Sequence, residues 1–259
     1  MPTTEFVIDL GESFPPLPRP PIVEAVIDIR VALPTPLEEA YVRAQLEGKT
    51  PGYAMLDSQR QIQVQHTLQP GIPPYAPTVQ DLGWKGLRLR SSEGRHIVQF
   101  NRDGFVFSRL EPYESWDQIY GESMRLWDTY MRLAAPVEII RIGVRYLNRI
   151  ELTENVARLE DYLYTAPRTP ESFDLPFQNF FHIDTLLMPK RACAVNIITT
   201  LQAETQSPGQ SLILDIDAFT QDALRTDSAS LETRLRELRW LKNKVFFGSV
   251  TKKTLALCR

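Results

Sequence analysis

The chain has 259 residues, of which 43% are hydrophobic and 24% charged, and its formal net charge is −3. This balance is typical of a globular protein and excludes intrinsic disorder and fibrous repeats. The N-terminus lacks a basic segment followed by an apolar one, and no uncharged apolar run reaches about 18 residues, so neither export nor membrane insertion is expected. Because two cysteines are too few for a disulfide framework, we expect a cytoplasmic protein.

The first part of the chain is predicted as a set of strands with one short helix. Residues 23–31 alternate between apolar and mostly charged side chains, as a half-buried strand requires. Residues 35–38 have the pattern of a capping box that opens a helix ending at Gly48. The segment Asn101-Arg102-Asp103-Gly104 favours a tight hairpin. Further strands are expected at about 59–68, 86–91, 95–101 and 105–110.

A longer helix is predicted from Ser115, which begins a second capping box. Trp116, Trp127 and Tyr130 recur at helical spacing and predict the face that packs on a sheet. Pro136 ends this helix, and a long strand is expected over 137–151. The remaining predicted elements are strands near 180–188, 193–203 and 211–218 and a helix from about Ser230.

Each half of the chain is thus predicted as a meander of strands followed by a long helix. This order is typical of an α+β fold, in which we expect antiparallel-rich sheets with long helices packed on one side. The two meander-plus-helix halves repeat only loosely. Residues 1–259 are expected to form one unit, with halves at 22–164 and 179–259 joined by a proline-rich connector.

Motifs for nucleotide binding, hydrolysis and metal binding are absent from the sequence. Gly48-Lys49-Thr50 resembles the end of a P-loop, but Arg43 occupies the position of the first glycine and a helix precedes the segment. The three histidines, His66, His96 and His182, are too far apart in the sequence for the usual metal spacing. Cys193 lies in an apolar run and is interpreted as a packing residue. No cofactor and no metal are therefore expected.

The predicted strand over 137–151 carries a row of arginines. Alternation places Arg141, Arg145 and Arg149 on one face, where they repel one another unless acidic groups lie nearby. The acidic residues that share a strand face elsewhere are Glu24 with Asp28 and Asp215 with Asp217. Two interpretations stay open: a ladder of cross-strand salt bridges, or a charged concavity that binds an anionic ligand or an acidic segment of a partner.

The predicted C-terminal helix is basic, because residues 231–259 hold eight Lys or Arg against two acidic residues. Its basic residues are Arg234, Arg236, Arg239, Lys242 and Lys244. We expect this basic face to be solvated and the apolar face to be buried. The residues expected to be buried are Leu231, Leu235, Leu238 and Val245. Nucleic-acid binding through the basic face is a weaker interpretation.

Three segments resemble a sporadically distributed family of uncharacterised bacterial and archaeal proteins of about 250 residues. They are the strand Pro20-Pro21-Ile22-Val23-Glu24-Ala25-Val26-Ile27-Asp28-Ile29-Arg30, the strand Arg145-Tyr146-Leu147-Asn148-Arg149-Ile150, and Leu214-Asp215-Ile216-Asp217. The resemblance spans nearly the whole chain and supplies no catalytic residue. The patchy occurrence of such a family implies horizontal transfer, which is common among toxin-antitoxin and phage-defence genes.

Missing catalytic motifs together with strongly polar strand faces favour a non-catalytic binding or regulatory protein. Such a protein could serve as an antitoxin or as an accessory component of a bacterial defence system, with another protein as its partner. The alternative is an enzyme or sensor for a phosphorylated small molecule or nucleotide, held by Arg141, Arg145 and Arg149. In that alternative Glu24, Asp28, Asp215 or Asp217 would hold a divalent metal.

Overall fold

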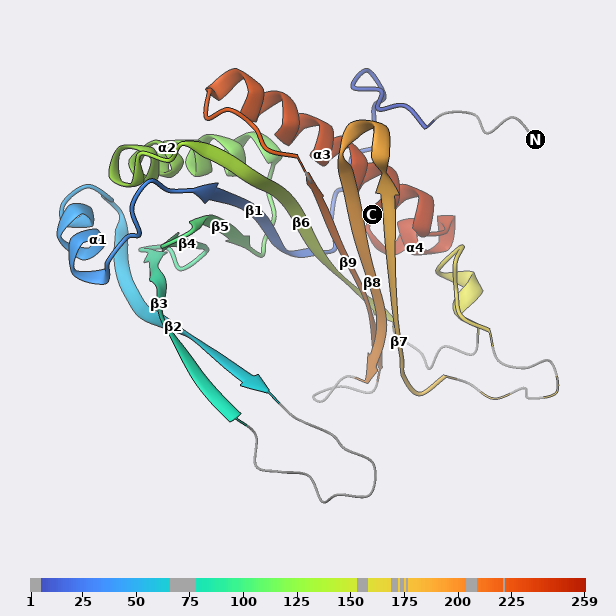
Figure 1. Ribbon diagram of the computed structural model, residues 1–259. Helices are drawn as coiled ribbons and strands as arrows, with labels where there is room; N and C mark the ends of the chain where they lie inside the picture. Colours follow the sequence, from blue (N-terminus) through green and yellow to red (C-terminus); the bar gives the residue numbers. More distant parts are fainter. Residues whose placement is uncertain are drawn as a thin grey trace.

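The computed structural model describes residues 6–65, 78–152, 158–168, 172, 175, 177–203, 209–220 and 222–259 (Figure 1). The strands are β1 (Ile22–Ala32), β2 (Tyr53–Gln65), β3 (Thr78–Ser91), β4 (His96–Asn101), β5 (Gly104–Leu110), β6 (Glu138–Leu152), β7 (Phe180–Met188), β8 (Cys193–Ala203) and β9 (Gln210–Thr220). The helices are α1 (Glu39–Leu46), α2 (Trp116–Ala134), α3 (Ser228–Ser249) and α4 (Lys252–Leu257), with 3-10 turns η1 (Leu159–Asp161) and η2 (Pro189–Arg191).

The predicted fold class, with long helices packed on one side of separate antiparallel-rich sheets in two halves, is wrong. One antiparallel sheet has the strand order β2-β3-β4-β5-β1-β6-β9-β8-β7. Strands account for 44% of the described residues and helices for 27%, in short to medium segments. The two predicted meanders merge because β6 pairs with β1 on one edge and with β9 on the other. Because the backbone of β6 forms hydrogen bonds with β1 of the first meander and with β9 of the second, the two meanders belong to one sheet.

Local sequence signals explain the individual strands. In β1, Ala25, Ile27 and Ile29 are buried and alternate with half-buried polar or smaller side chains, which confirms the predicted strand. The predicted hairpin is also confirmed, because β4 ends at Asn101 and β5 begins opposite it at Gly104. A Cβ atom on Gly104 would lie 2.4 Å from the backbone oxygen of Ile29, so this close approach to β1 requires glycine.

The helix boundaries follow the capping residues in part. The Ser115 side chain accepts a hydrogen bond from the Gln118 backbone, and Asp227 caps α3 in the same way through Ser230. The capping box predicted at 35–38 is wrong, because α1 begins only at Glu39 and Glu38 makes no side-chain cap. A helix of eight residues without a cap is stabilised mainly by packing of its apolar side chains.

Two of the helices, α2 and α3, lie on the same face of the sheet (Figure 1). From α2, Trp116, Trp127 and Tyr130 are buried, and Trp127 packs edge-on against Phe105 of β5 at 5.8 Å between ring centres. The Tyr130 hydroxyl donates to the Asn101 backbone oxygen at 3.0 Å. The main hydrophobic core therefore lies between these two helices and the sheet.

The basic face predicted for the C-terminal helix is only partly solvated. Of the residues expected to be buried, Leu231, Leu235 and Leu238 of α3 are buried and Val245 is half-buried. Lys242 is also buried, with 7% exposure. It follows Leu238 by one helical turn, so it lies on the apolar face of α3 above the ring of Tyr146. The prediction that all the basic side chains face solvent is therefore wrong for Lys242.

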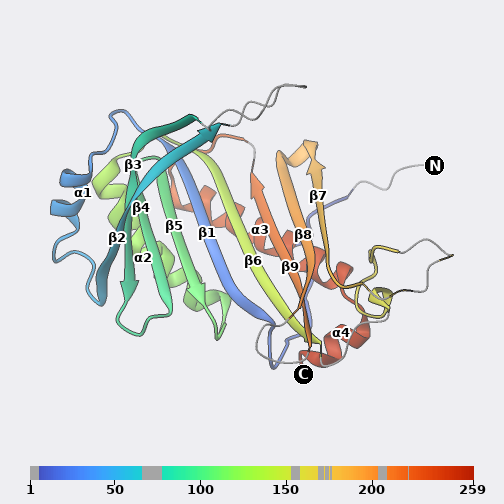
Figure 2. The ribbon, with the colours of Figure 1, turned by 90° about the horizontal axis from the view of Figure 1, so that it is seen from below.

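None of the helices among the described residues covers the other face of the sheet, which is the concave one (Figures 1 and 2). We call the surface on this side the open face; its central residues are Glu24, Val26, Asp28 and Arg30 of β1, Arg141, Arg145 and Arg149 of β6, and Asp215 and Asp217 of β9. The paired strands β2 and β3 extend beyond the body as an arm (Figure 1). None of the helices in the described ranges is long and apolar enough to span a membrane.

Candidate functional site

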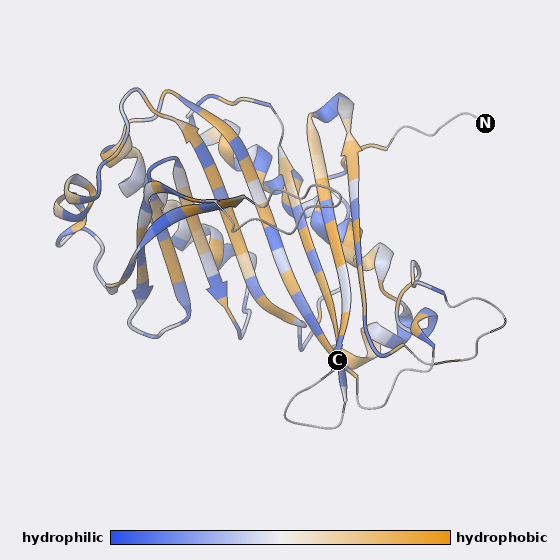
Figure 3. Cartoon of the chain, turned by 60° about the horizontal axis from the view of Figure 1, so that its bottom comes forward, coloured by the Kyte–Doolittle hydropathy of each residue, from blue (hydrophilic) through white to orange (hydrophobic). Residues whose placement is uncertain are grey.

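The open face carries the row of arginines singled out from the sequence. Figure 3 shows polar and apolar residues alternating along the strands of this region. Arg145 of β6 lies opposite Val26 of β1 and opposite Asp217 of β9, in the middle of the sheet. The pairing of β6 with β9 is regular from Gly143 to Leu152, so Arg145 and Arg149 point to the same side.

Arg141 bridges two carboxylates on the neighbouring strands. Its Nη1 donates to Asp28 Oδ2 at 3.0 Å, and its Nη2 donates to Asp217 Oδ2 at 2.8 Å. The guanidinium also lies 4.6 Å from the centre of the Phe219 ring. A Cβ atom on Gly143 would come within 2.7 Å of Arg141 Nη1. Gly143 therefore leaves the space in which the guanidinium reaches both strands.

Arg145 pairs with one carboxylate, while Arg149 pairs with none that belongs to the described residues. The Arg145 Nε donates to Asp215 Oδ1 at 2.8 Å, and Nη2 donates to the second oxygen of the same carboxylate. This bidentate contact raises the pKa of Arg145. Within the described ranges, the Arg149 guanidinium and the Glu24 carboxylate have no hydrogen-bond or ion-pair partner, although Glu24 lies close enough to influence Arg145. Burial raises the pKa of the Asp217 carboxyl, against the opposing effect of Arg141 and Arg145.

The charges of this cluster balance. Four basic side chains (Arg30, Arg141, Arg145, Arg149) face four acidic ones (Glu24, Asp28, Asp215, Asp217). The guanidiniums of Arg141 and Arg145 are already occupied by protein carboxylates, so they offer few free donors to an added anion. Among the residues that the structure describes, no group of three or more His, Cys, Asp or Glu side chains could hold a metal ion. The arrangement therefore resembles a salt-bridge lattice with free charges at Glu24 and Arg149.

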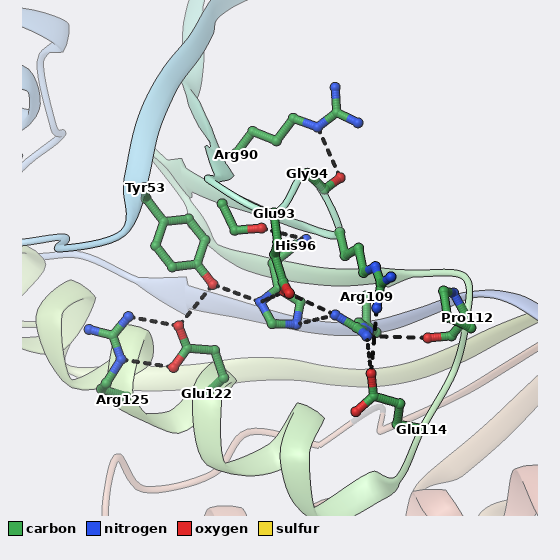
Figure 4. Close-up of polar contacts among 12 residues, drawn as sticks. Tyr53, Arg90, Glu93, Gly94, His96, Arg109, Pro112, Glu114, Glu122 and Arg125 are labelled. Atoms are coloured by element: carbon green, nitrogen blue, oxygen red, sulfur yellow. Dashed lines mark hydrogen bonds and ion pairs between the residues drawn. The ribbon is translucent and has the colours of Figure 1, made fainter.

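A second polar network lies on the helix side of the sheet and was missed by the sequence analysis (Figure 4). Its centre is Arg109 of β5, which is only 5% exposed. Arg109 donates to Glu93 at 3.1 Å, to Glu114 at 2.8 Å and to the Pro112 backbone oxygen at 3.3 Å. Its Nη1 also lies 3.1 Å from His96 Nε2. A fully buried guanidinium is stable here because several oxygen acceptors and one nitrogen acceptor surround it.

The directions of the hydrogen bonds fix the tautomer of His96. Arg109 can only donate, so His96 Nε2 accepts and the proton lies on Nδ1. Nδ1 then donates to the Tyr53 hydroxyl at 3.1 Å, and Tyr53 donates to Glu122 Oε1 at 2.9 Å. Burial lowers the pKa of His96, and the Arg109 guanidinium lowers it further. The chain of donors thus connects β5, β4 and β2 to α2 through a neutral imidazole.

One sequence signal could have revealed this network. In β5, residues 105, 107 and 109 share a face, and two of them are phenylalanines that are fully buried. Arg109 on this apolar face requires buried acceptors, and the residues that follow it offer Glu111 and Glu114, of which Glu114 accepts from Arg109 in the structure. The remaining partners, His96 and Tyr53, come from other strands and give no local signal.

The other candidate residues have ordinary environments or lie outside the described residues, as His66 does. His182 Nε2 lies 2.9 Å from Asp184 Oδ2 on the exposed strand β7. The Cys193 thiol donates to the Arg191 backbone oxygen, and burial raises its pKa, which is the opposite of what an activated nucleophile needs. These environments give no support to a nucleophilic site at Cys193.

A cavity lined by described residues lies where β1 begins and β6 ends. It has a volume of about 900 Å³ and is bounded by residues 18–23, 111–113, 149–151 and 256–258. Arg19, Arg149, Glu111 and Glu151 line it, so the charges at its wall also balance. Arg149 lines this cavity and also belongs to the open face, so the two surfaces adjoin at this residue.

Comparison with protein-family models and with curated proteins finds no match for this chain. The resemblance to an uncharacterised family therefore stays a prediction from the sequence.

Proposed function

We propose that this chain is a non-catalytic binding protein that holds another protein on the open face of its sheet. The main support is the contrast between the two faces of the sheet: α2 and α3 cover one face, while none of the helices that the structure describes covers the other. The open face combines the salt-bridge lattice with exposed apolar side chains on β7, of which Phe181 and Ile183 are 67% and 55% exposed. A mixed surface of this kind suits a protein partner, because protein interfaces combine apolar contact with paired charges.

The charge balance favours a protein over a phosphorylated small molecule. A phosphate site needs free donors, and Arg141 donates to two aspartates while Arg145 donates to one. A protein partner, in contrast, needs only complementary charges at the edges of the contact. Glu24 and Arg149 supply one unpaired charge of each sign for this purpose.

The basic residues of α3 give little support to nucleic-acid binding. Arg234 pairs with Asp222 and Glu237, and Lys244 pairs with Glu12. Lys242 is buried, so it cannot reach a phosphate backbone. Nucleic-acid binding depends on several free cations along one surface.

One observation favours the alternative of an anionic small molecule. The cavity of about 900 Å³ is lined in part by Arg149, whose guanidinium has no hydrogen-bond or ion-pair partner within the described ranges. If this cavity holds a phosphorylated ligand, pyrophosphate or ATP should raise the melting temperature of the protein, because a ligand that binds only the folded state stabilises it. Arg149→Ala should abolish that shift.

The proposed function can be tested with one pair of arginine variants. Candidate partners are the proteins encoded beside this chain, and a toxin or defence protein is the class that the sequence resemblance implies. We expect Arg149→Glu to weaken binding of such a partner about tenfold or more, since it reverses an unpaired charge on the open face. Arg236→Glu is the matched control, because Arg236 is also exposed and without an ion pair in the described part of the chain, but lies on α3.

Calorimetry with the purified partner measures both dissociation constants, and circular dichroism checks that both variants are folded. Loss of binding in Arg149→Glu alone supports the open face. Equal binding by both variants, or loss in Arg236→Glu alone, contradicts the proposal.

A further inference from the structure

Strand β7 ends the sheet, and its outer edge has no partner strand among the residues that the structure describes (Figure 2). It pairs with β8 from Phe180 to Met188 without a bulge. Proteins usually protect such edges with proline, lysine, a bulge or a covering element. The segment 180–188 contains neither proline nor lysine, so its backbone is free to pair with another strand.

The exposed side chains of β7 are mostly apolar. Phe181, Ile183 and Leu187 lie on the open face and are 67%, 55% and 60% exposed. Leu186, on the opposite face, is 52% exposed. Isolated apolar side chains are common on protein surfaces, but four in one unprotected edge strand mark an interaction site.

We propose that β7 pairs antiparallel with β7 of a second copy of this chain, so that the two sheets form one continuous sheet across a two-fold axis. The charges of the strand support this partner. With Ile183 on the axis, His182 of each copy lies directly opposite Asp184 of the other. The strand therefore complements itself, because the imidazole of each copy can also donate to the Asp184 carboxylate of the other copy, in addition to its contact at 2.9 Å with Asp184 of its own strand.

The register centred on Asp184 is less favourable. With Asp184 on the axis, the two Asp184 carboxylates would face each other, and like charges directly opposite destabilise a strand pair. The register centred on Ile183 instead places Ile183 beside its own copy and Phe181 beside Thr185. Phe181 and Ile183 of both copies then form one apolar cluster on the open face, which becomes continuous between the two molecules.

The dimer is expected to be of moderate affinity. Pairing through a single strand buries less surface area than the roughly 1,200–2,000 Å² of a standard protein interface. We therefore expect a dissociation constant in the micromolar range. The inference shares Phe181 and Ile183 with the open face of the proposed function, but it does not rest on that function, because pairing of the β7 edges requires no other protein.

Sedimentation equilibrium of the purified full-length chain tests the dimer between about 1 µM and 300 µM. We expect a reversible monomer–dimer equilibrium for the wild type and a monomer at all these concentrations for Ile183→Lys, which places two ammonium groups together on the axis. Ile62→Lys is the matched control, because Ile62 is 60% exposed on β2, the strand at the other end of the sheet. This variant should dimerise like the wild type.

Charge exchange tests the register. His182→Asp should weaken the dimer at least tenfold, because it places carboxylates opposite each other. The double variant His182→Asp/Asp184→Lys should restore dimerisation, since the new carboxylate of each copy would then lie opposite the new ammonium group of the other.

Several results would overturn the inference. They are a wild type that stays monomeric or forms open-ended assemblies, an Ile183→Lys variant that dimerises normally, an Ile62→Lys variant that does not, and a double variant that fails to recover. A wild type that is monomeric but binds an extended peptide along β7 would assign the edge to a different protein.

Discussion

Arg141 shows how a row of like charges becomes stable in the middle of a sheet. Alternation along the sequence predicted its face correctly, and the aspartates of β1 and β9 were among the predicted partners. The geometry of the bridge also involves Gly143, because a Cβ atom there would lie 2.7 Å from Arg141 Nη1 and the guanidinium would have to shift. That involvement could not be predicted, since it arises only when both neighbouring strands are in place.

Lys242 is the residue whose environment differs most from the prediction. Its ammonium lies 3.3 Å from the centre of the Tyr146 ring and has no carboxylate partner in the described part of the chain. Burial lowers its pKa well below the usual 10.5, and the nearby Arg239 adds to the effect. The spacing of Leu231, Leu235, Leu238 and Lys242 was the signal that could have placed it on the buried face.

Lys242→Met is expected to stabilise the protein. The pKa of Lys242 is about 10.5 in the unfolded chain and well below that value in the folded protein. At a pH between these two pKa values the unfolded chain binds one more proton, so the free energy of unfolding of the wild type rises with pH over this range. Removing the buried amine should raise the free energy of unfolding by about 1–3 kcal/mol near pH 7, after loss of the contact with Tyr146. Urea denaturation at pH 7 and at about pH 9.5 measures both values.

The advantage of the methionine variant should shrink at the higher pH. Tyr146→Leu serves as a control for the lost ring contact, because it removes the same contact and keeps the amine. A Lys242→Met variant that is less stable than the wild type at both pH values contradicts this account.

At the scale of elements, the network around Arg109 and His96 holds α2 against three strands. His96 contributes from β4, Tyr53 from β2 and Glu122 from α2. Protonation of His96 would place a second N–H against the donor of Arg109, so the network requires the neutral ring. Glu93, Glu114 and Glu122 oppose the lowering of the pKa, but burial and Arg109 outweigh them.

The network is expected to make stability sensitive to acid. In the folded protein the pKa of His96 is lower than its ordinary value of 6.5, which applies in the unfolded chain. The free energy of unfolding is therefore highest above pH 6.5 and decreases as the pH falls through 6.5 towards the pKa of the folded state. His96→Gln keeps one acceptor for Arg109 and one donor for Tyr53 but cannot titrate. Between pH 7 and pH 5 we expect the wild type to lose about 1 kcal/mol more than the variant.

Thermal and urea denaturation at both pH values provide the comparison, and His182→Gln is the control for an exposed histidine on β7. Parallel losses in the wild type and His96→Gln would exclude His96 as the acid-sensitive group.

Several elements could be predicted from local sequence. The predicted bounds of β7 and β8 are those of the structure, and β1, the hairpin after β4 and the Ser115 cap were predicted from alternation and turn residues. Strand β2 begins at Tyr53, earlier than predicted, because register shifts between Met55 and Ile62 interrupt the alternation that marks a strand. A strand with irregular pairing therefore cannot be recognised from the alternation of apolar and polar residues alone.

At the scale of the whole molecule, the sheet could not be predicted because strand order is a long-range property. Alternation in β6 shows which side chains share a face, but not that β1 and β9 occupy its two edges. The same pairing brings Asp28 and Asp217 to either side of Arg141. The candidate residues were therefore identified from the sequence, while the open face to which they belong required the structure.

The central claim, that a partner protein binds the open face, is tested most directly by carbodiimide footprinting of carboxylates with and without the partner. Glu24 and Glu151 report on the open face, and the exposed Asp117 and Glu232 report on α2 and α3. We predict that the partner protects Glu24 and Glu151 severalfold and leaves Asp117 and Glu232 unchanged, since an interface excludes water and reagent from the side chains it covers. Protection of Asp117 and Glu232 with unchanged labelling of Glu24 and Glu151 would contradict the claim.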